Sequence, residues 1–493
     1  MMQFLVDLFG AAMSYTALNH YVLVAVCLLV YYLIPKKGQW CVLLAASLAF
    51  YWFASRGSLP EILVFLSTIL ISYAGGLLIE RFRDGKGGAW LFPLFALASV
   101  APLLIIKGSD FLAAPPKDGA SGLIVPLGVS FYSLQVYAYL SDVRHGRISA
   151  QRNPLRYALF ISFFPGIVQG PISRYSQLSA QLFDGHRFDE RQVVRGALLV
   201  LWGFFLKYMI ADRAAVFVNA VFASPDMYRG AYVVAAGALY SIQLYADFLA
   251  CVNLSIGVAE AFGIQLVNNF DHPYFARSIK DFWRRWHMSL SSWLRDYVYI
   301  PLGGNRKGRV RKYLNLLLVF LVSGLWHGSG VQFLAWGAIH AVYQIVGDIT
   351  LPVRQLLKDL LGIRQDSRSD ALFQRVCTFI LVAFAWVLFR AESLEVGLDM
   401  LGSVFTTRNP WVFFNDALLQ LGLDWKEWVV LGLSVATLYQ AGRLQERMCV
   451  RDRILAQPLV YRWAFYVVAI LIVIVFGTYG YGFNAADFIY GGF

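Results

Sequence analysis

The sequence contains few charged residues for its length. Only 15% of its 493 residues are Asp, Glu, Lys or Arg, against about 25% in soluble globular proteins, whereas 58% are hydrophobic. This shortage of charge excludes the class of soluble globular proteins. It predicts a polytopic membrane protein.

The sequence also lacks the patterns of several familiar sites. Its five cysteines are scattered without a CxxC pair, which argues against a disulfide framework and a zinc site. It contains no HExxH, GxSxG or GxxxxGK motif. The glycines of 480–485 match the shape of a dinucleotide fingerprint but follow an apolar run instead of a βαβ unit. Zinc peptidase, serine hydrolase and nucleotide-binding functions are therefore not indicated.

Apolar runs recur from end to end. They are long enough for α-helical spans, whereas a transmembrane barrel would show short alternating segments. The fold class expected is all-α, with about 11–12 transmembrane helices plus re-entrant and interfacial helices. The predicted spans lie near 21–34, 40–54, 60–79, 90–106, 122–140, 194–211, 231–250, 313–327, 331–348, 375–390, 426–442 and 461–478.

The net charge of +12 is distributed unevenly between the predicted loops. With span-end residues counted in the adjoining loop, loops on one side hold 33 of the 42 Lys and Arg, those on the other hold 8, and Lys207 falls inside a span. Such a bias marks the cytoplasmic side of a membrane protein and gives no indication of nucleic-acid binding. Both termini are predicted to lie outside.

Two segments differ from ordinary spans. Residues 161–175, ISFFPGIVQGPISRY, are apolar but too short to cross and are broken by two prolines and two glycines. They predict either a re-entrant element or an interfacial turn. Residues 278–300 place aromatic side chains at helical spacing opposite basic ones, which predicts an amphipathic helix at a membrane interface, with His287 on its apolar side.

The stretch 313–348 contains two apolar runs separated by Trp326-His327-Gly328-Ser329-Gly330. A titratable imidazole is costly at such a position, so His327 is interpreted as either a general base or a helix-packing histidine. In one helix His327 and His340 would lie about 20 Å apart along the axis. No carboxylate accompanies them, so no metal site is expected. Asp247 is a second costly group that usually faces a partner or a wet cavity, and it is interpreted either as a helix-packing or interfacial residue or as a catalytic one.

Several long motifs in fixed order resemble the membrane-bound O-acyltransferase family. They are FFPGIVQGPISRY, NNFDHPYFARSIKDFWRRW, WRRWHMSLSSWLRDYVYIPLGGNRKG, GLWHG and WGAIHA, between 163 and 341. The most similar branch acetylates alginate and other cell-surface glycans. This resemblance implies a single membrane domain around a central tunnel, with a helical scaffold at 1–160, a catalytic core at 161–348 and C-terminal helices at 349–493.

The resemblance also implies site residues. His327 matches the catalytic histidine, and His287 matches the position of an auxiliary His or Asn. Apart from the resemblance, the glycine-rich basic turn with Arg306 and Lys307 is interpreted either as a contact for the donor's phosphates or as a membrane-surface loop. Candidate residues lining the substrate tunnel are Trp326, Trp286, Asp247, Asn315, His340, Arg284 and Arg285. The family often has DFSGYSD where this chain has DFLACVN at 247–253, so the nature of the acceptor is left open.

The implied reaction transfers an acetyl group from cytoplasmic acetyl-CoA across the membrane to an exported polysaccharide or peptidoglycan. No bound cofactor is expected, and the implied location is the inner membrane of a bacterium. The implied partner is an extracytoplasmic Ser-His-Asp acetyltransferase or polymer-export machinery. The alternatives are D-alanyl transfer to teichoic acid from a carrier-protein thioester, and a transporter or flippase without acyl chemistry.

Overall fold

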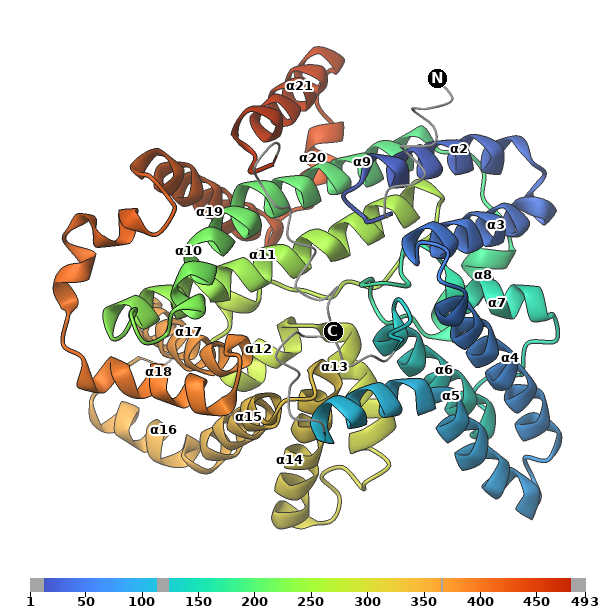
Figure 1. Cartoon of the computed structure of the whole chain (residues 1–493), viewed down its shortest axis with the longest axis horizontal. Coiled ribbons are helices and arrows are strands. Elements are labelled where there is room, and N and C mark those ends of the chain that lie inside the picture. Colours follow the sequence, from blue (N-terminus) through green and yellow to red (C-terminus); the bar gives the residue numbers. More distant parts are fainter. Residues whose placement is uncertain (1–12, 113–123, 365–366, 480–493) are drawn as a thin grey trace. The chain divides into compact units, whose positions relative to one another are not determined.

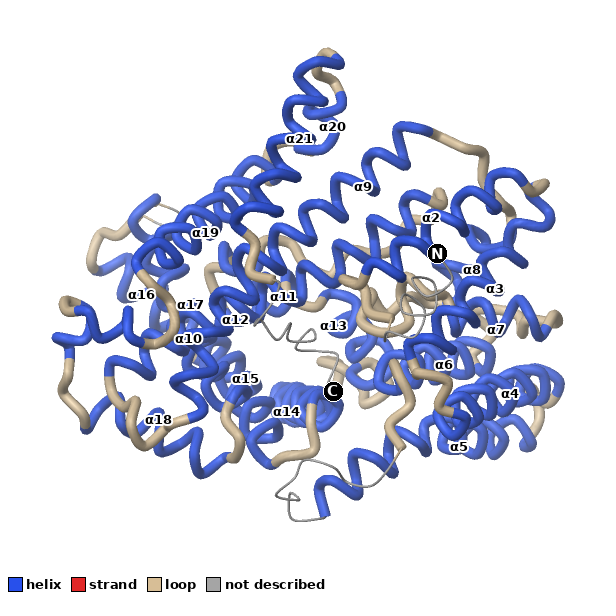
Figure 2. Tube along the Cα trace, turned by 45° about the horizontal axis from the view of Figure 1, so that its top comes forward, coloured by secondary structure: helices blue, strands red, loops and turns tan. Residues whose placement is uncertain are grey.

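The computed structural model describes residues 13–112, 124–364 and 367–479, and within these ranges the regular secondary structure is helical, with no strand (Figure 1, Figure 2). The expected all-α membrane fold is confirmed. By length and composition, six of the described helices can cross a membrane. They are Leu59–Arg81, Gly87–Ser109, Glu190–Ala223, Ala231–Ala261, Arg368–Arg390 and Leu459–Phe476.

The chain divides into two compact units. The first comprises residues up to 204 together with 251–268, and the second comprises 205–250 together with the rest from 269. This division differs from the functional one expected at 160 and 348, which stays a prediction. The helices of the first unit are α2 (Leu18–Leu33), α3 (Lys36–Ala54), α4 (Leu59–Arg81), α5 (Lys86–Leu112), α6 (Val129–Arg144), α7 (Pro154–Ser162), α8 (Tyr175–Phe183), α9 (Glu190–Phe205, up to 204) and the end of α11 (Ala231–Ala261).

The second unit contains the remaining helices and most of α11. Two of its elements, η1 and η3, are π-helices. The bounds are η1 (Leu206–Ala211), α10 (Asp212–Ala223), η2 (Pro273–Phe275), α12 (Ile279–Arg285), α13 (Met288–Leu294), η3 (Arg295–Tyr299), α14 (Gly308–His327), α15 (Val331–Ile349), α16 (Leu351–Leu360), α17 (Arg368–Arg390), α18 (Leu394–Thr406), η4 (Pro410–Phe413), η5 (Asp416–Gln420), α19 (Trp425–Gln445), α20 (Val450–Leu455) and α21 (Leu459–Phe476).

Each of the twelve predicted apolar segments falls on a helix, but one begins later than expected. The segment predicted at 122–140 starts as α6 at Val129, and its first two residues lie outside the described ranges. Pro126 and Gly128 precede the helix, and Gly128 has a φ of 73°. A Cβ at Gly128 would lie 2.4 Å from the carbonyl oxygen of Ile167. The start of α6 is therefore set by a close backbone approach that only glycine allows.

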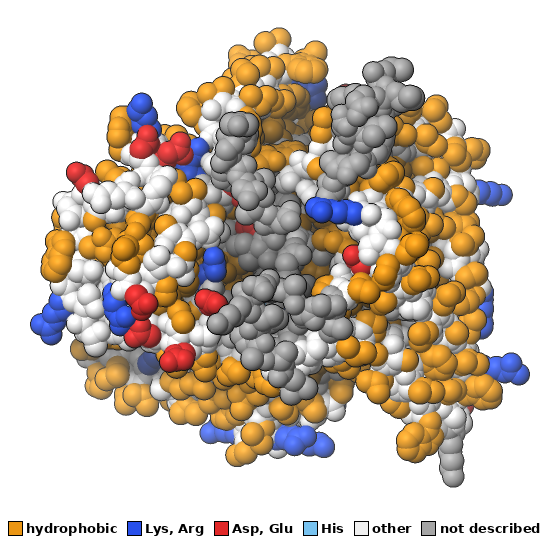
Figure 3. All heavy atoms as spheres, viewed as in Figure 1, with side chains coloured by type: hydrophobic (Ala, Val, Ile, Leu, Met, Phe, Trp, Pro, Cys, Tyr) orange, Lys and Arg blue, Asp and Glu red, His pale blue; other side chains and the backbone are white. Residues whose placement is uncertain are grey.

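In the first unit, α4, α5 and α6 pack against one another. Nearly all of α6 is buried, while α4 and α5 expose leucines such as Leu63, Leu70 and Leu94. Hydrophobic side chains cover much of the face drawn in Figure 3. Exposed apolar helix faces of this kind match the surface that a membrane protein presents to lipid.

The segment between α7 and α8 is irregular and buried inside the first unit. Phe163, Phe164 and Ile167 are each at most 3% exposed. The Tyr15 hydroxyl donates to the Phe164 carbonyl over 2.8 Å, and the Phe164 N–H donates to the Ser47 hydroxyl over 3.2 Å. Side chains thus satisfy backbone groups that proline prevents from joining a helix. This burial in protein is what the re-entrant interpretation of 161–175 requires.

The predicted amphipathic helix at 278–300 is wrong as a continuous helix. It is three short elements, α12, α13 and η3, with a break at Trp286-His287. Its aromatic side chains also pack inside the protein: Trp283, Trp286 and Trp293 are at most 9% exposed. The helical spacing identified the apolar residues correctly, but the surface they cover is the core of the second unit and not a membrane interface.

Candidate active site

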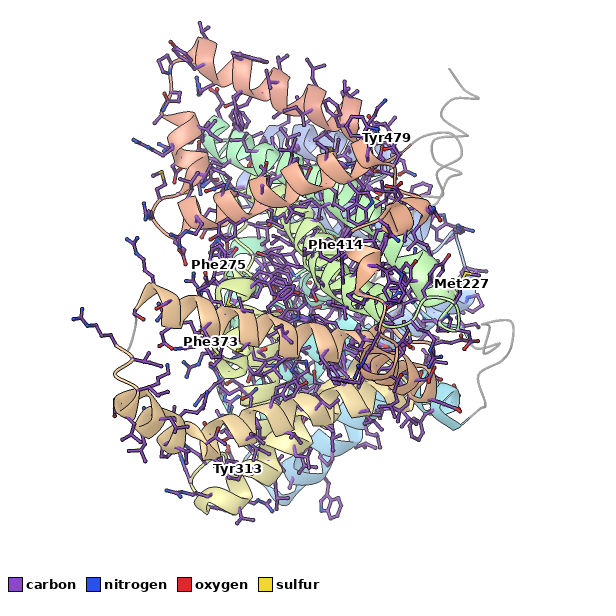
Figure 4. All side chains as sticks on the ribbon, turned by 90° about the vertical axis from the view of Figure 1, so that its left-hand side faces the viewer. Met227, Phe275, Tyr313, Phe373, Phe414 and Tyr479 are labelled. Atoms are coloured by element: carbon purple, nitrogen blue, oxygen red, sulfur yellow. The ribbon has the colours of Figure 1, made fainter. Side chains whose placement is uncertain are left out.

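The site is built on the helical hairpin of α14 and α15. Two glycines allow these helices to pack closely, because a Cβ at Gly324 would lie 2.4 Å from the Phe333 carbonyl oxygen and one at Gly337 would lie 2.3 Å from that of Phe320. Lys312 and Asp348 form an ion pair where the hairpin begins and ends. Figure 4 labels Tyr313, in the second turn of α14, and Phe373 on α17, the helix that packs against α15. The two apolar runs on either side of Gly328–Gly330 therefore fold back on each other as a hairpin.

His327 is the last residue of α14 and is 2% exposed. Three aromatic rings surround its imidazole at centroid distances of 4.8 Å for Trp326, 5.2 Å for Trp336 and 5.4 Å for Phe389. All three contacts are edge-to-face. The rings hold the imidazole in one orientation and shield it from bulk water, which is the environment in which a positioned base is most effective.

His287 lies beside His327, although forty residues separate them in the sequence. Their ring centroids are 6.4 Å apart, and the His287 ring meets Phe248 of α11 edge-on at 4.8 Å. The backbone of His287 is left-handed, with φ 44° and ψ 54°, a conformation that is strained for a non-glycine residue. Such strain persists where the surroundings impose it, and it concentrates at functional sites.

Asn269 holds this break and was not recognised as a site residue from the sequence. It is fully buried, its carbonyl accepts from the Met288 N–H over 2.9 Å, and its side-chain oxygen accepts from the Ser289 N–H over 3.1 Å. These bonds satisfy the first N–H groups of α13. The signal was present, because Asn269 belongs to the NNF start of a motif that carries the family resemblance.

His287 is neutral at pH 7. It lies in the short connection between α12 and α13, outside the candidate spans. Burial lowers the pKa of its imidazole to about 3, because the protein interior does not solvate an imidazolium cation. A neutral imidazole can donate and accept hydrogen bonds but carries no positive charge.

Tryptophans dominate the walls of the site, and the sequence identified only two of them as site residues. Trp286 stacks on Phe282 and lies 5.2 Å from Trp386 of α17, which stacks on Trp336 at 5.6 Å. Trp336 and Trp386 were missed because neither lies next to a histidine in the sequence. Only the packing of α15 against α17 brings them together.

His340 is also fully buried, one helical turn beyond Trp336 on α15. The Trp283 indole donates to its Nδ1 over 3.2 Å. The ring centroids of Trp336 and His340 are 5.2 Å apart. His340 therefore belongs to the wall of the site, and Trp336 lies between it and His327.

Asp247 forms a buried ion cluster with two residues of the helix formed by α9, η1 and α10. Lys207 Nζ lies 2.9 Å from Oδ1 of both Asp247 and Asp212, and the three side chains are 3–4% exposed. Tyr245 and Phe248 of α11 contact Trp286 and His287. At 100° per residue around the helix axis, Asp247 lies roughly 130° from the face that these two residues share. Asp247 thus pairs with a cation on a helix face away from the histidines. The sequence showed Lys207 only as a charge inside a span.

Of the remaining predicted residues, the basic ones lie at or near the surface, and Asn315 is buried beneath the basic turn. Arg284 is exposed, and Arg285 pairs with Asp281 over 3.1 Å. Arg306 and Lys307 are exposed on the turn between η3 and α14. Asn315 is fully buried, and its amide donates to the carbonyls of Leu302 and Gly304 over 3.3 and 2.9 Å. Asn315 therefore shapes the basic turn.

The sequence of this chain is similar to those of known proteins. The profile described as "MBOAT, membrane-bound O-acyltransferase family" matches residues 118–390, which include both histidines. The probable alginate O-acetylase AlgI of Pseudomonas fluorescens is 33% identical over 379 residues, which cover 76% of this chain and 72% of that protein. The peptidoglycan O-acetyltransferase of Helicobacter pylori is 34% identical over 402 residues, covering 75% and 73%. The teichoic acid D-alanyltransferase of Bacillus subtilis is 28% identical over 323 residues, covering 63% and 80%.

Proposed function

The chain belongs to the membrane-bound O-acyltransferase family, and on this premise we propose that it transfers an acetyl group from acetyl-CoA to a hydroxyl of an exported polysaccharide or peptidoglycan. The observation that carries the proposal is the meeting of His327 and His287 inside the aromatic walls of the second unit. Their location within the matched range supports an acyl-transfer role. Family membership also makes the chain an acyltransferase enzyme, so the non-enzymatic transporter is set aside.

In the proposed reaction, His327 acts as the general base. Its imidazole accepts the proton of the acceptor hydroxyl as the hydroxyl oxygen bonds to the acetyl carbon. The C–S bond then breaks, and the proton passes from His327 to the thiolate of CoA. The neutral His287 imidazole provides a second hydrogen-bonding group beside this centre, and the surrounding rings limit competing attack by water.

The donor's phosphates are proposed to lie at the basic turn before α14. Gly303 and Gly304 have φ of 100° and 57°, which allow backbone shapes that other residues rarely adopt. Arg306 and Lys307 extend from the same exposed turn, and Asn315 holds its carbonyls from below. Exposed cations on a turn braced from inside suit a polyanionic nucleotide.

The proposed location follows the charge distribution. The basic turn and the other Lys- and Arg-rich loops lie on the cytoplasmic side of a bacterial inner membrane, and both termini lie outside. His327, at the far end of α14 from that turn, is then placed to receive an acceptor from outside. An extracytoplasmic Ser-His-Asp acetyltransferase or the polymer-export machinery is the proposed partner.

The donor is tested with the purified full-length protein in lipid nanodiscs. We expect radiolabelled acetyl-CoA to be consumed and the label to pass to a glycan acceptor, with the partner enzyme present and absent. A D-alanyl thioester on a carrier protein serves as the competing donor, because the Bacillus subtilis relative is named for D-alanyl transfer. Consumption of the carrier thioester without consumption of acetyl-CoA would show that the proposed donor is wrong.

The role of His287 is tested with three substitutions that separate backbone strain from chemistry. Asn tolerates a left-handed backbone and keeps a polar group, so His287→Asn is expected to retain acetyl transfer within about tenfold. His287→Ala removes the polar group and is expected to lower transfer about 100-fold. It also keeps the strain of an L-residue at φ 44°, which costs about 1 kcal/mol.

His287→Gly is the matched control. Glycine relieves the strain without restoring the polar group, so this variant should be at least as stable as His287→Ala and equally inactive. The measurements are the rate of acetyl transfer and the unfolding temperature of the three variants. Together they separate loss of the polar group from relief of backbone strain. Equal activity of the Asn and Ala variants would exclude a chemical role for His287.

A further inference from the structure

Two buried hydrogen-bond donors lie one helical turn apart on α15, and the ring of the first contacts His327. They are the indole Nε1 of Trp336 and the imidazole Nε2 of His340, and both side chains are 0% exposed. Neither atom has a hydrogen-bond partner among the residues that the structure describes. The Trp336 ring lies 5.2 Å from the rings of both His327 and His340.

The contact with Trp283 determines which nitrogen of His340 carries the proton. An indole N–H can only donate, and Trp283 Nε1 directs its hydrogen to His340 Nδ1 over 3.2 Å. Nδ1 must therefore be the unprotonated acceptor. The neutral imidazole then carries its hydrogen on Nε2, which makes Nε2 a donor of fixed identity.

Two buried donors without an acceptor are unfavourable in a folded protein, which normally satisfies such groups. Their chemistry defines what they would bind. Indole N–H and imidazole N–H require an acceptor atom, and they stabilise one that gains negative charge most strongly. In acyl transfer such an atom exists, because the carbonyl oxygen of the thioester becomes an oxyanion when the nucleophile attacks.

We propose that Trp336 Nε1–H and His340 Nε2–H bind the carbonyl oxygen of the acyl group and stabilise the oxyanion that forms on it. This assignment rests on the proposed acetyl transfer. As the hydroxyl oxygen bonds to the acetyl carbon, the C=O π electrons move to the carbonyl oxygen, which the two donors hold. When the C=O bond re-forms, the C–S bond breaks and its electrons leave with the CoA sulfur, which takes the proton from His327. Trp283 acts as a positioning residue through the tautomer of His340.

The test uses Trp336→Phe in the full-length protein, because Phe keeps an aromatic ring and removes only the N–H and the second ring. We expect kcat for acetyl transfer to fall about 100-fold, as when one oxyanion donor is lost, while KM for acetyl-CoA stays within about threefold. Trp428→Phe is the matched control. Trp428 lies on α19 against Phe217, and its indole N–H likewise has no acceptor among the described residues.

A second measurement separates oxyanion binding from structural damage. A trifluoromethyl ketone analogue of acetyl-CoA forms a hydrate that resembles the tetrahedral intermediate. Its inhibition constant is expected to rise at least about tenfold in Trp336→Phe and to be unchanged in Trp428→Phe. A partly misfolded variant would lose active protein but keep the inhibition constant of the active fraction.

Trp283→Phe carries the test if Trp336→Phe does not accumulate. Without the Trp283 N–H, either nitrogen of His340 can carry the proton. The inhibition constant of the same analogue should therefore rise at least about threefold. An inhibition constant within twofold of wild type in both variants would overturn the assignment. That result is also expected if the two donors hold only an internal water molecule. Failure of the wild-type protein to use acetyl-CoA would instead overturn the proposed function, and this assignment with it.

Discussion

Replacement of His327 with alanine is expected to lower acetyl transfer about 1,000-fold, the loss typical of removing a positioned general base. The expectation depends on where His327 lies. Its imidazole is 2% exposed, enclosed by three aromatic rings and 6.4 Å from His287. A water molecule that entered in place of the ring would be a far weaker base and would not be held at the same position.

The measurement is the O-acetyl content of the surface polymer together with acetyl-CoA consumption by the purified protein. His145→Ala is the matched control, because His145 is an exposed histidine at the end of α6 whose ring contacts the Ser141 carbonyl. His327→Gln retains polarity without comparable basicity and should be nearly as inactive as the alanine variant. Undiminished acetylation by a correctly inserted His327→Ala variant would refute a catalytic role.

Replacement of Lys207 with methionine is expected to destabilise the protein and to lower its accumulation. Methionine has a similar length, so the change removes the charge and little volume. It leaves the carboxylates of Asp212 and Asp247 at 3% exposure without the cation that each contacts at 2.9 Å. An uncompensated buried charge costs about 3–5 kcal/mol, a large share of the stability of a folded protein. The unfolding temperature in nanodiscs should fall by about 3–5 °C.

Asp212→Asn is the informative counterpart. The cluster contains one cation and two carboxylates, and this change leaves one of each while keeping an acceptor for Lys207. It should therefore be as stable as wild type or more so. Combining Lys207→Met with Asp212→Asn and Asp247→Asn should recover part of the lost stability, because no charge then remains buried.

Lys426→Met provides the control for loss of a lysine. Lys426 is exposed at the start of α19, where its amine lies near the Trp425 ring. A charge at the surface is solvated by water or lipid headgroups, so its loss should change the unfolding temperature little. Equal stability of Lys207→Met and Lys426→Met would show that the cluster does not hold the helices together.

The sequence by itself determined the membrane class and the positions of the helices. Helix hydrogen bonds are local, and lipid requires long apolar segments with satisfied backbones, so the positions of most helices can be inferred from composition and length alone. All twelve apolar segments fall on helices for this reason. The start of α6 differs from the prediction because a distant contact acts there: the backbone of Gly128 approaches that of Ile167.

The sequence also predicted His327 and His287 as site residues, but only through ordered motifs. The residues around His327 in the sequence did not distinguish a general base from a helix-packing histidine. Trp336, although it begins the WGAIHA motif, and Lys207 were not recognised as parts of a cluster. Trp386 and Asp247, which complete these clusters, lie on other helices, so no pattern within one segment could indicate them.

Only the tertiary structure decided how these residues meet. It placed His287 beside His327, broke the predicted helix at 286–287, paired Lys207 with Asp212 and Asp247, and directed the Trp283 N–H to His340. Each of these features joins residues that are distant in the sequence or imposes a strained backbone. Such contacts form because whole helices pack their side chains together, and packing depends on the three-dimensional shape of all partners at once.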